Sequence, residues 1–96
     1  MQDDDFEWSD EKARRNLAKH KIDFRAARYV FEDAGALDEI DDRFDYGEER
    51  YRIVGMVNGR LMMVSYTLRE HRIRIISARP ASRQLENEYA RQNPPN

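Results

Sequence analysis

Three consecutive stretches in the second half of the chain are rich in the apolar, β-branched and aromatic residues that β-strands prefer, and side chains in the first of them alternate between two faces. The stretches cover residues 50–57, 61–68 and 72–79. Asn58-Gly59 separates the first two and favours a type I′ turn, because both residues tolerate positive φ. Arg69-Glu70-His71 forms the second turn signal. The sequence therefore predicts a three-strand antiparallel meander.

The first third of the chain has helical periodicity instead. Ser9 is a suitable N-cap for a helix that ends at Lys19 or His20, and Ala13 and Leu17 supply only a narrow apolar stripe. Most of this helix should therefore be exposed and basic.

A second helix should begin at Asp23 and end near Gly35, which is expected to cap it in a left-handed conformation. Its apolar side chains recur at helical spacing and should bury one face. They are Phe24, Ala27, Val30 and Phe31.

Pro80 should end the last strand, and Ser82 should cap a C-terminal helix. Residues 6–8 and 36–40 favour short edge strands. The predicted fold is α+β: a small antiparallel sheet, made of the meander and one or two short edge strands, with two N-terminal helices and one C-terminal helix. We expect one domain over residues 1–96, flexible at residues 1–5 and 93–96.

Regular alternation in the third strand would put Ile73 and Ile75 on the same face as Ser77 and Arg79. Arg79 would then start on the buried side and emerge at the strand's end. A guanidinium held at the rim of a packed face is well fixed for contacting a phosphate.

Charge divides the chain more sharply than the net charge of −2 suggests. Residues 1–49 carry 16 acids and 8 bases, whereas residues 50–83 carry 8 arginines and the single acid Glu70. An anionic partner for the basic part and internal ion pairing between the two parts are both compatible with this division. The exclusive use of arginine favours forked recognition of phosphate or carboxylate.

The absence of cysteine and of any apolar run near the roughly 20 residues needed to span a bilayer favours a cytoplasmic protein. His20 and His71 lie far apart, so no transition-metal site and no cofactor are expected. The acidic loop over residues 38–49 lacks the spacing of a calcium loop.

A basic sheet with aromatic companions is a common way to hold single-stranded RNA. Tyr66 is a candidate for stacking on bases, and Arg69, Arg72 and Arg74 are candidates for contacting phosphates. The alternative is that these tyrosines are core residues and that the arginines only cover a half-exposed sheet.

Several motifs, in this order, resemble the BrnT toxins of bacterial toxin–antitoxin systems over about residues 6–90. They include the FEW start followed by Lys12 and Asn16, the Lys19-His20 pair, YGEER at 46–50, Tyr66-Thr67 with Arg69, and IRIISAR ending in Arg79. One departure is Lys21, where the family usually has glycine, so a differently shaped helix end is expected there.

The resemblance implies a RelE-like fold and a metal-independent endoribonuclease that inhibits translation. It also implies a BrnA-like antitoxin with a ribbon-helix-helix DNA-binding domain. The complex would contact operator DNA only through this antitoxin. Metal-free RNA cleavage needs a base, an acid and cations around the phosphorane. Candidates for the base are Lys19, His20 and Glu49, and candidates for the phosphate clamps are Arg50 and Arg79.

Two other functions remain open at this point. A binding module could hold RNA or a protein without cutting anything, although it would not require the acid–base residue types of the Lys19-His20 pair and Glu49. A repressor that contacts DNA alone is disfavoured, since the chain has no recognisable helix-turn-helix pattern and a net negative charge.

Overall fold

The computed structural model describes residues 1–43, 45 and 47–95. Phe44 and Tyr46, in the acidic loop and the YGEER motif, and Asn96, at the end of the tail, lie outside the described residues. The elements in chain order are β1 (Phe6–Glu7), α1 (Asp10–His20), α2 (Phe24–Ala27), the 3₁₀ helix η1 (Arg28–Glu32), β2 (Leu37–Asp41), β3 (Arg50–Val57), β4 (Arg60–Arg69), β5 (Arg72–Pro80) and α3 (Arg83–Gln92).

The strands form one five-stranded sheet in the order β1-β5-β4-β3-β2. β2, β3, β4 and β5 pair antiparallel in sequence, whereas β1 pairs parallel to β5. The prediction of an antiparallel sheet was therefore wrong at one edge, and the sheet is mixed. A hairpin forces antiparallel pairing, but β1 and β5 are joined by most of the chain and are free of that constraint.

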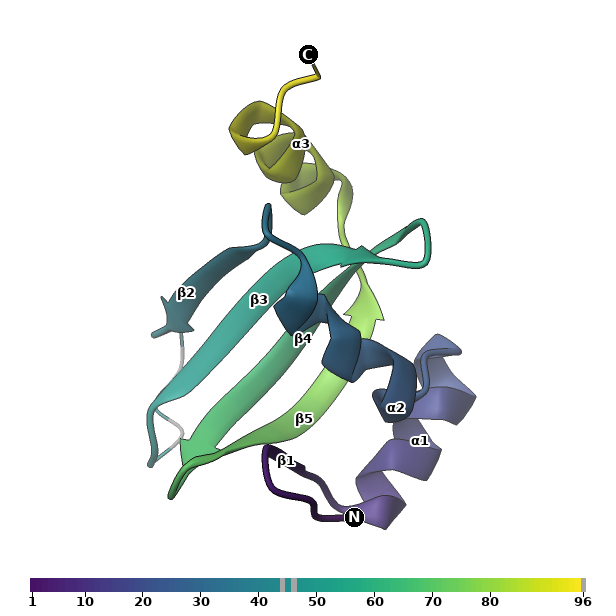
Figure 1. The fold of residues 1–96 in the computed structure, drawn as a ribbon, viewed down its shortest axis with the longest axis vertical. Helices are drawn as coiled ribbons and strands as arrows, with labels where there is room; N and C mark the ends of the chain where they lie inside the picture. Colours follow the sequence, from purple (N-terminus) through teal and green to yellow (C-terminus); the bar gives the residue numbers. More distant parts are fainter. Residues whose placement is uncertain (44, 46, 96) are drawn as a thin grey trace.

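Helices cover one face of this sheet. In Figure 1, α2 and η1 cross the face turned to the viewer, α1 lies beside β5, and α3 stands beyond the end of the sheet. Phe24, Ala27 and Val30 of the predicted apolar stripe have no exposed surface, and they pack on strand residues such as Val64 and Ile75. Their burial fixes the helical layer on this face, which we call the helix face.

The predicted helix starts are confirmed, because a local side-chain hydrogen bond defines each of them. The Ser9 hydroxyl accepts from the Lys12 amide, the Asp23 carboxylate accepts from the Arg25 amide, and the Ser82 hydroxyl accepts from the Leu85 amide. The Asn58-Gly59 turn is confirmed too, with φ of 50° and 77°.

Gly35 does not form the predicted left-handed cap. The helical segment ends at Glu32, Asp33 follows with an extended backbone, and the glycines with positive φ among the described residues are Gly47 and Gly59. Gly35 instead leaves room for Asn93, whose side-chain oxygen lies 2.1 Å from where a Cβ would stand. Its role is close packing rather than backbone freedom.

The predicted stripe on α1 was also wrong in part. Ala13 packs against the core, but Leu17 is 45% exposed and Asn16 is the buried residue of the helix. The reason is a polar contact with β5, described below. The helix end differs from expectation as well: Lys21 adopts the left-handed cap with φ of 61°, the conformation that glycine favours.

One extra residue in β5 decides which way its last side chains point. Ser65 and Tyr66 are adjacent on β4, but their partners Ser77 and Ile75 are not adjacent on β5, so Ile76 forms a β-bulge. Ile75 and Ala78 both lie in the core as a result. Arg79 therefore lies on the opposite face, and its predicted start on the buried side was wrong.

The face opposite the helix face is polar around the bulge. Its residues alternate along their strands with residues that face the helices. Arg50, Arg52, Ser65, Ser77 and Arg79 lie on this side, which we call the polar face.

Candidate active site

Arg79 occupies the centre of a basic surface. It lines three adjoining depressions: one of about 360 Å³ toward α1, one of about 290 Å³ over the polar face, and one of about 280 Å³ toward α3. Its side chain is exposed and has no hydrogen-bond or ion-pair partner among the described residues. An unpaired guanidinium in a concave surface is available to an anionic ligand.

The depression toward α1 places basic side chains from that helix beside Arg79. Lys12, Arg15, Lys19 and His20 line it together with Ser77 of β5. Burial lowers the pKa of His20 below its ordinary value of 6.5, and the charges of Arg79 and Lys19 lower it further. The imidazole is therefore neutral at pH 7, the form that can accept a proton.

The depression over the polar face is lined by both Arg50 and Arg79. Ser65 and Ser77, which face each other across β4 and β5, lie between the two arginines and line the same hollow. Arg50 also pairs with Glu48 at 3.4 Å. The two arginines predicted as phosphate clamps thus border one depression from opposite ends of β3 and β5.

Asp41 is a buried carboxylate at the wall of this depression. Arg43 donates to it through Nε at 2.8 Å and Nη2 at 3.0 Å. These hydrogen bonds, with the charges of Arg43 and Arg52, lower the pKa of Asp41 to about 2 against the opposing effect of burial. Asp41 therefore stays ionised and keeps Arg43 beside the site.

Asn16 holds α1 against β5 next to Arg79. Its side-chain oxygen accepts from the Ala78 amide at 3.0 Å, and its Nδ2 donates to the carbonyls of Ala78 at 2.9 Å and Ile22 at 3.0 Å. The amide thus pairs with the free edge of β5 as a neighbouring strand would. This contact sets the position of Lys19 and His20 relative to Arg79.

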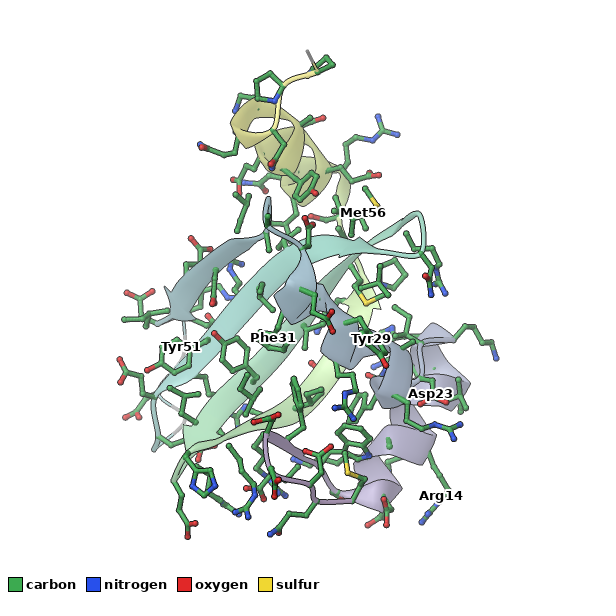
Figure 2. All side chains as sticks on the ribbon, in the orientation of Figure 1. Arg14, Asp23, Tyr29, Phe31, Tyr51 and Met56 are labelled. Atoms are coloured by element: carbon green, nitrogen blue, oxygen red, sulfur yellow. The ribbon has the colours of Figure 1, made fainter. Side chains whose placement is uncertain are left out.

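Glu49 is not brought to this surface. Burial and the charge of Glu49 raise the pKa of Tyr51, and Figure 2 shows Tyr51 on the helix face of the sheet, near Phe31. The Glu49 carbonyl accepts from the Thr67 hydroxyl at 2.7 Å. Of the three candidate bases, Lys19 and His20 line the same depression as Arg79.

Tyr66 lies in the core, as the alternative interpretation of the tyrosines had it. The residue is 6% exposed, and its ring stacks on Tyr51 with centroids 5.3 Å apart and meets Phe31 edge to face. Its hydroxyl donates to Asp38 at 2.7 Å. Burial and this hydrogen bond raise the pKa of Tyr66. A buried ring offers no open surface for stacking on a base.

Arg69, Arg72 and Arg74 lie at the other end of β4 and β5, near β1. Arg74 pairs with Glu7 at 2.8 Å, and Arg72 donates to the Asp3 carbonyl at 2.8 Å. These two arginines of the predicted RNA-binding set therefore hold the N-terminal segment to the sheet.

Sequence reasoning missed Ser65, Ser77, Asp41 and Arg43 as site residues. Asp41 stands within a run of acids, and the two serines are isolated polar residues in strands, so neither pattern singles them out. The structure holds no group of three or more His, Asp or Glu residues arranged to bind a metal ion within its described part.

A scan of protein-family models matches residues 8–84 to the ribonuclease toxin BrnT of type II toxin–antitoxin systems. The chain belongs to the BrnT family. BrnT proteins are ribonuclease toxins of type II systems, and a toxin of this type has an antitoxin partner. The match includes α1 and the strands that carry Arg50 and Arg79.

A search among curated proteins gave no significant match. None of the helices within the described residues is long and apolar enough to cross a membrane.

Proposed function

We propose that this BrnT-family chain is a metal-independent endoribonuclease whose active site is the basic surface around Arg79. The observation that carries the proposal is the convergence of Lys19, His20 and Arg50 on the two depressions that share Arg79. These groups supply a proton acceptor, a proton donor and fixed positive charge, the three requirements of metal-free RNA cleavage.

In the proposed reaction the ribose 2′-oxygen attacks the adjacent phosphorus and the bond from phosphorus to the 5′-oxygen breaks. The products are a 2′,3′-cyclic phosphate and a free 5′-hydroxyl. His20 accepts the proton of the 2′-hydroxyl, because its lowered pKa keeps the imidazole neutral at pH 7. Lys19 donates a proton to the departing 5′-oxygen.

Arg79 and Arg50 stabilise the negative charge that builds on the phosphorane. Guanidinium groups present paired donors that match phosphate oxygens. They stabilise the transition state more strongly when they are held in position before the reaction. Arg79 has no competing partner among the described residues, so it can engage the phosphate without breaking an ion pair. Glu49 is omitted from this mechanism because it lines none of the three depressions at Arg79.

The proposal extends to the biology of the system. We expect a RelE-like fold relationship, RNA as the substrate, inhibition of translation in the cytoplasm, and neutralisation by a BrnA-like antitoxin with a ribbon-helix-helix domain that alone contacts operator DNA. Support comes from the family match and from the gathering of cations beside Arg79, which an acidic segment would neutralise. Alanine at Arg79 should then weaken the toxin–antitoxin complex and its dependence on salt.

The decisive experiment is incubation of the purified chain, freed of antitoxin, with RNA in EDTA. We expect cleavage that leaves 2′,3′-cyclic phosphate ends. Arg79→Ala and His20→Ala should each lower the cleavage rate by about 100-fold or more. Arg60→Ala, which removes an exposed arginine that lines none of the three depressions, is the matched control and should cut normally.

Intact RNA that nevertheless shifts in mobility with the wild-type chain would identify a binding module and end the enzyme proposal. Full activity in both Arg79→Ala and His20→Ala would show that cleavage occurs at another site.

A further inference from the structure

The third depression at Arg79 is a cleft between the polar face and α3. It has a volume of about 280 Å³ and shares Arg79 and Arg43 with the depression over the polar face. A strand of RNA whose phosphate lies at Arg79 would therefore place the neighbouring nucleotide at the mouth of this cleft. The cleft is lined by Arg43, Arg52, Met63, Arg79, Pro80, Ser82, Gln84, Leu85 and Glu88.

The lining combines an apolar floor with flat cationic groups. Met63 is only 4% exposed at the base of the cleft, and Pro80 and Leu85 flank it. Arg52 is held by Glu39 across β2 and β3, with Nε 2.6 Å from the carboxylate. A purine or pyrimidine ring packs well on such a combination, because its faces are apolar and also stack on guanidinium planes.

Polar groups for the edge of a base come from α3. Gln84 and Glu88 are one helical turn apart and both line the cleft. Neither side chain has a hydrogen-bond or ion-pair partner in the part of the chain that the structure describes. Glu88 is half-buried where it lines the cleft.

The far side of α3 is tied down independently of the cleft. The Tyr89 hydroxyl donates to Asp33 at 2.7 Å, and the Asn93 amide donates to the Gly35 carbonyl at 2.9 Å. These contacts orient the helix and leave Gln84 and Glu88 available to a ligand. The wall of the cleft is thus fixed before any ligand binds, which favours discrimination between ligands.

We propose that this cleft binds the base of the nucleotide next to the cleaved phosphate and makes the enzyme selective for that base. Glu88 accepts a hydrogen bond from an amino group on the edge of the base. Guanine, adenine and cytosine carry such a group, and uracil does not. The inference rests on the proposed ribonuclease function and adds a specificity to it: uracil is disfavoured at one position beside the cut.

The test is to sequence the cleavage sites in a random RNA library for the wild-type chain, Glu88→Gln and Glu86→Gln. For the wild type we expect uracil to be depleted by about tenfold at one position beside the cut, since a hydrogen bond to a charged acceptor contributes this much. Glu88→Gln keeps one acceptor oxygen but loses the charge and gains an NH2 donor that suits a uracil carbonyl, so it should bring this depletion close to parity. Glu86 lies on the same helix outside the cleft and pairs with Arg83, so Glu86→Gln should behave as wild type.

Cleavage without any base preference beside the cut would overturn the subsite and leave the ribonuclease function standing. A preference that survives in both Glu88→Gln and Leu85→Ala would overturn it as well, and weaker antitoxin binding by these variants would then assign the cleft to the protein partner. Absence of RNA cleavage by the wild-type chain would overturn the ribonuclease function, and the subsite with it.

Discussion

At the scale of single residues, His20 is the group whose protonation should control activity. Its pKa lies below 6.5 because of burial and the charges of Arg79 and Lys19. Cleavage should therefore be active at neutral pH and fall as pH drops through this lowered pKa, where the imidazole becomes protonated. A pH–rate profile of the wild-type chain measures this acid limb.

Arg79→Gln removes one of the charges that lower this pKa, so the pKa of His20 should rise in the variant. Titration of the imidazole signals by NMR reads this shift without relying on activity. His71, in the turn between β4 and β5, reports in the same spectra whether the variant disturbs the fold elsewhere. An unchanged His20 titration would contradict the proximity of the two side chains.

Asn16 should matter for stability more than its polar character suggests. Asn16→Ala leaves the amide and carbonyl of Ala78 and the carbonyl of Ile22 without this partner. We expect the free energy of unfolding to fall by about 2–4 kcal/mol, because unpaired buried polar groups are costly. Urea unfolding measures the loss, with Asn87→Ala on the exposed side of α3 as the control. A loss no larger than that of the control would show that the hydrogen bonds of the Asn16 side chain do not stabilise the fold.

At the scale of elements, Gly55 sets how closely η1 and the segment after it approach β3. A Cβ at this position would lie 2.8 Å from Val30 Cγ2 and 3.2 Å from Asp33 Oδ2. Gly55→Ala should lower the free energy of unfolding by about 1–3 kcal/mol, since the close-packed layer must shift. Urea unfolding is again the measurement. Met56→Ala, at the exposed neighbouring position, should cost clearly less, and equal losses would contradict the packing argument.

Features determined by contacts between residues close in sequence could be predicted from the sequence. Features determined by contacts between residues far apart in sequence could not. Ser9, Asp23 and Ser82 cap their helices through residues two or three positions away. The bulge at Ile76 instead depends on pairing with β4, and the burial of Tyr66 depends on Phe31, which comes 35 residues earlier. Lys19, His20, Arg50 and Arg79 were candidates by residue type, but only the fold shows that they share a surface.

At the scale of the whole molecule, some arginines of the basic strands form ion pairs with acids from the first half of the chain. Arg52 pairs with Glu39 and Arg74 pairs with Glu7, so the acidic half partly neutralises the basic strands. Arg79 has no ion-pair partner among the described residues and lies near the lysines of α1. The interpretation of internal ion pairing therefore applies to Arg52 and Arg74, whereas an anionic partner for Arg79 stays a prediction.

Asp41 should contribute to the acid stability of the whole fold. Its folded-state pKa of about 2 lies below the ordinary 3.8, so its stabilising effect is complete above 3.8 and is lost as pH falls toward 2. The gap in unfolding free energy between wild type and Asp41→Asn should be large at pH 7 and shrink over this window. Asp42→Asn, at the exposed neighbouring position, is the control. A gap independent of pH would contradict the lowered pKa.

The bulge at Ile76 decides on which face of the sheet Arg79 lies, because it adds one residue to β5. Ile75 and Ala78 are both core residues although they are three apart, and that odd spacing is what turns Arg79 away from the helices. Loss of Ile76 would remove the bulge and restore regular alternation, so that Ala78 stays on the core side and Arg79 stays on the polar face. Deletion of Ile76 should therefore leave Arg79 facing the same depressions, and related chains are best compared by the face on which a residue lies.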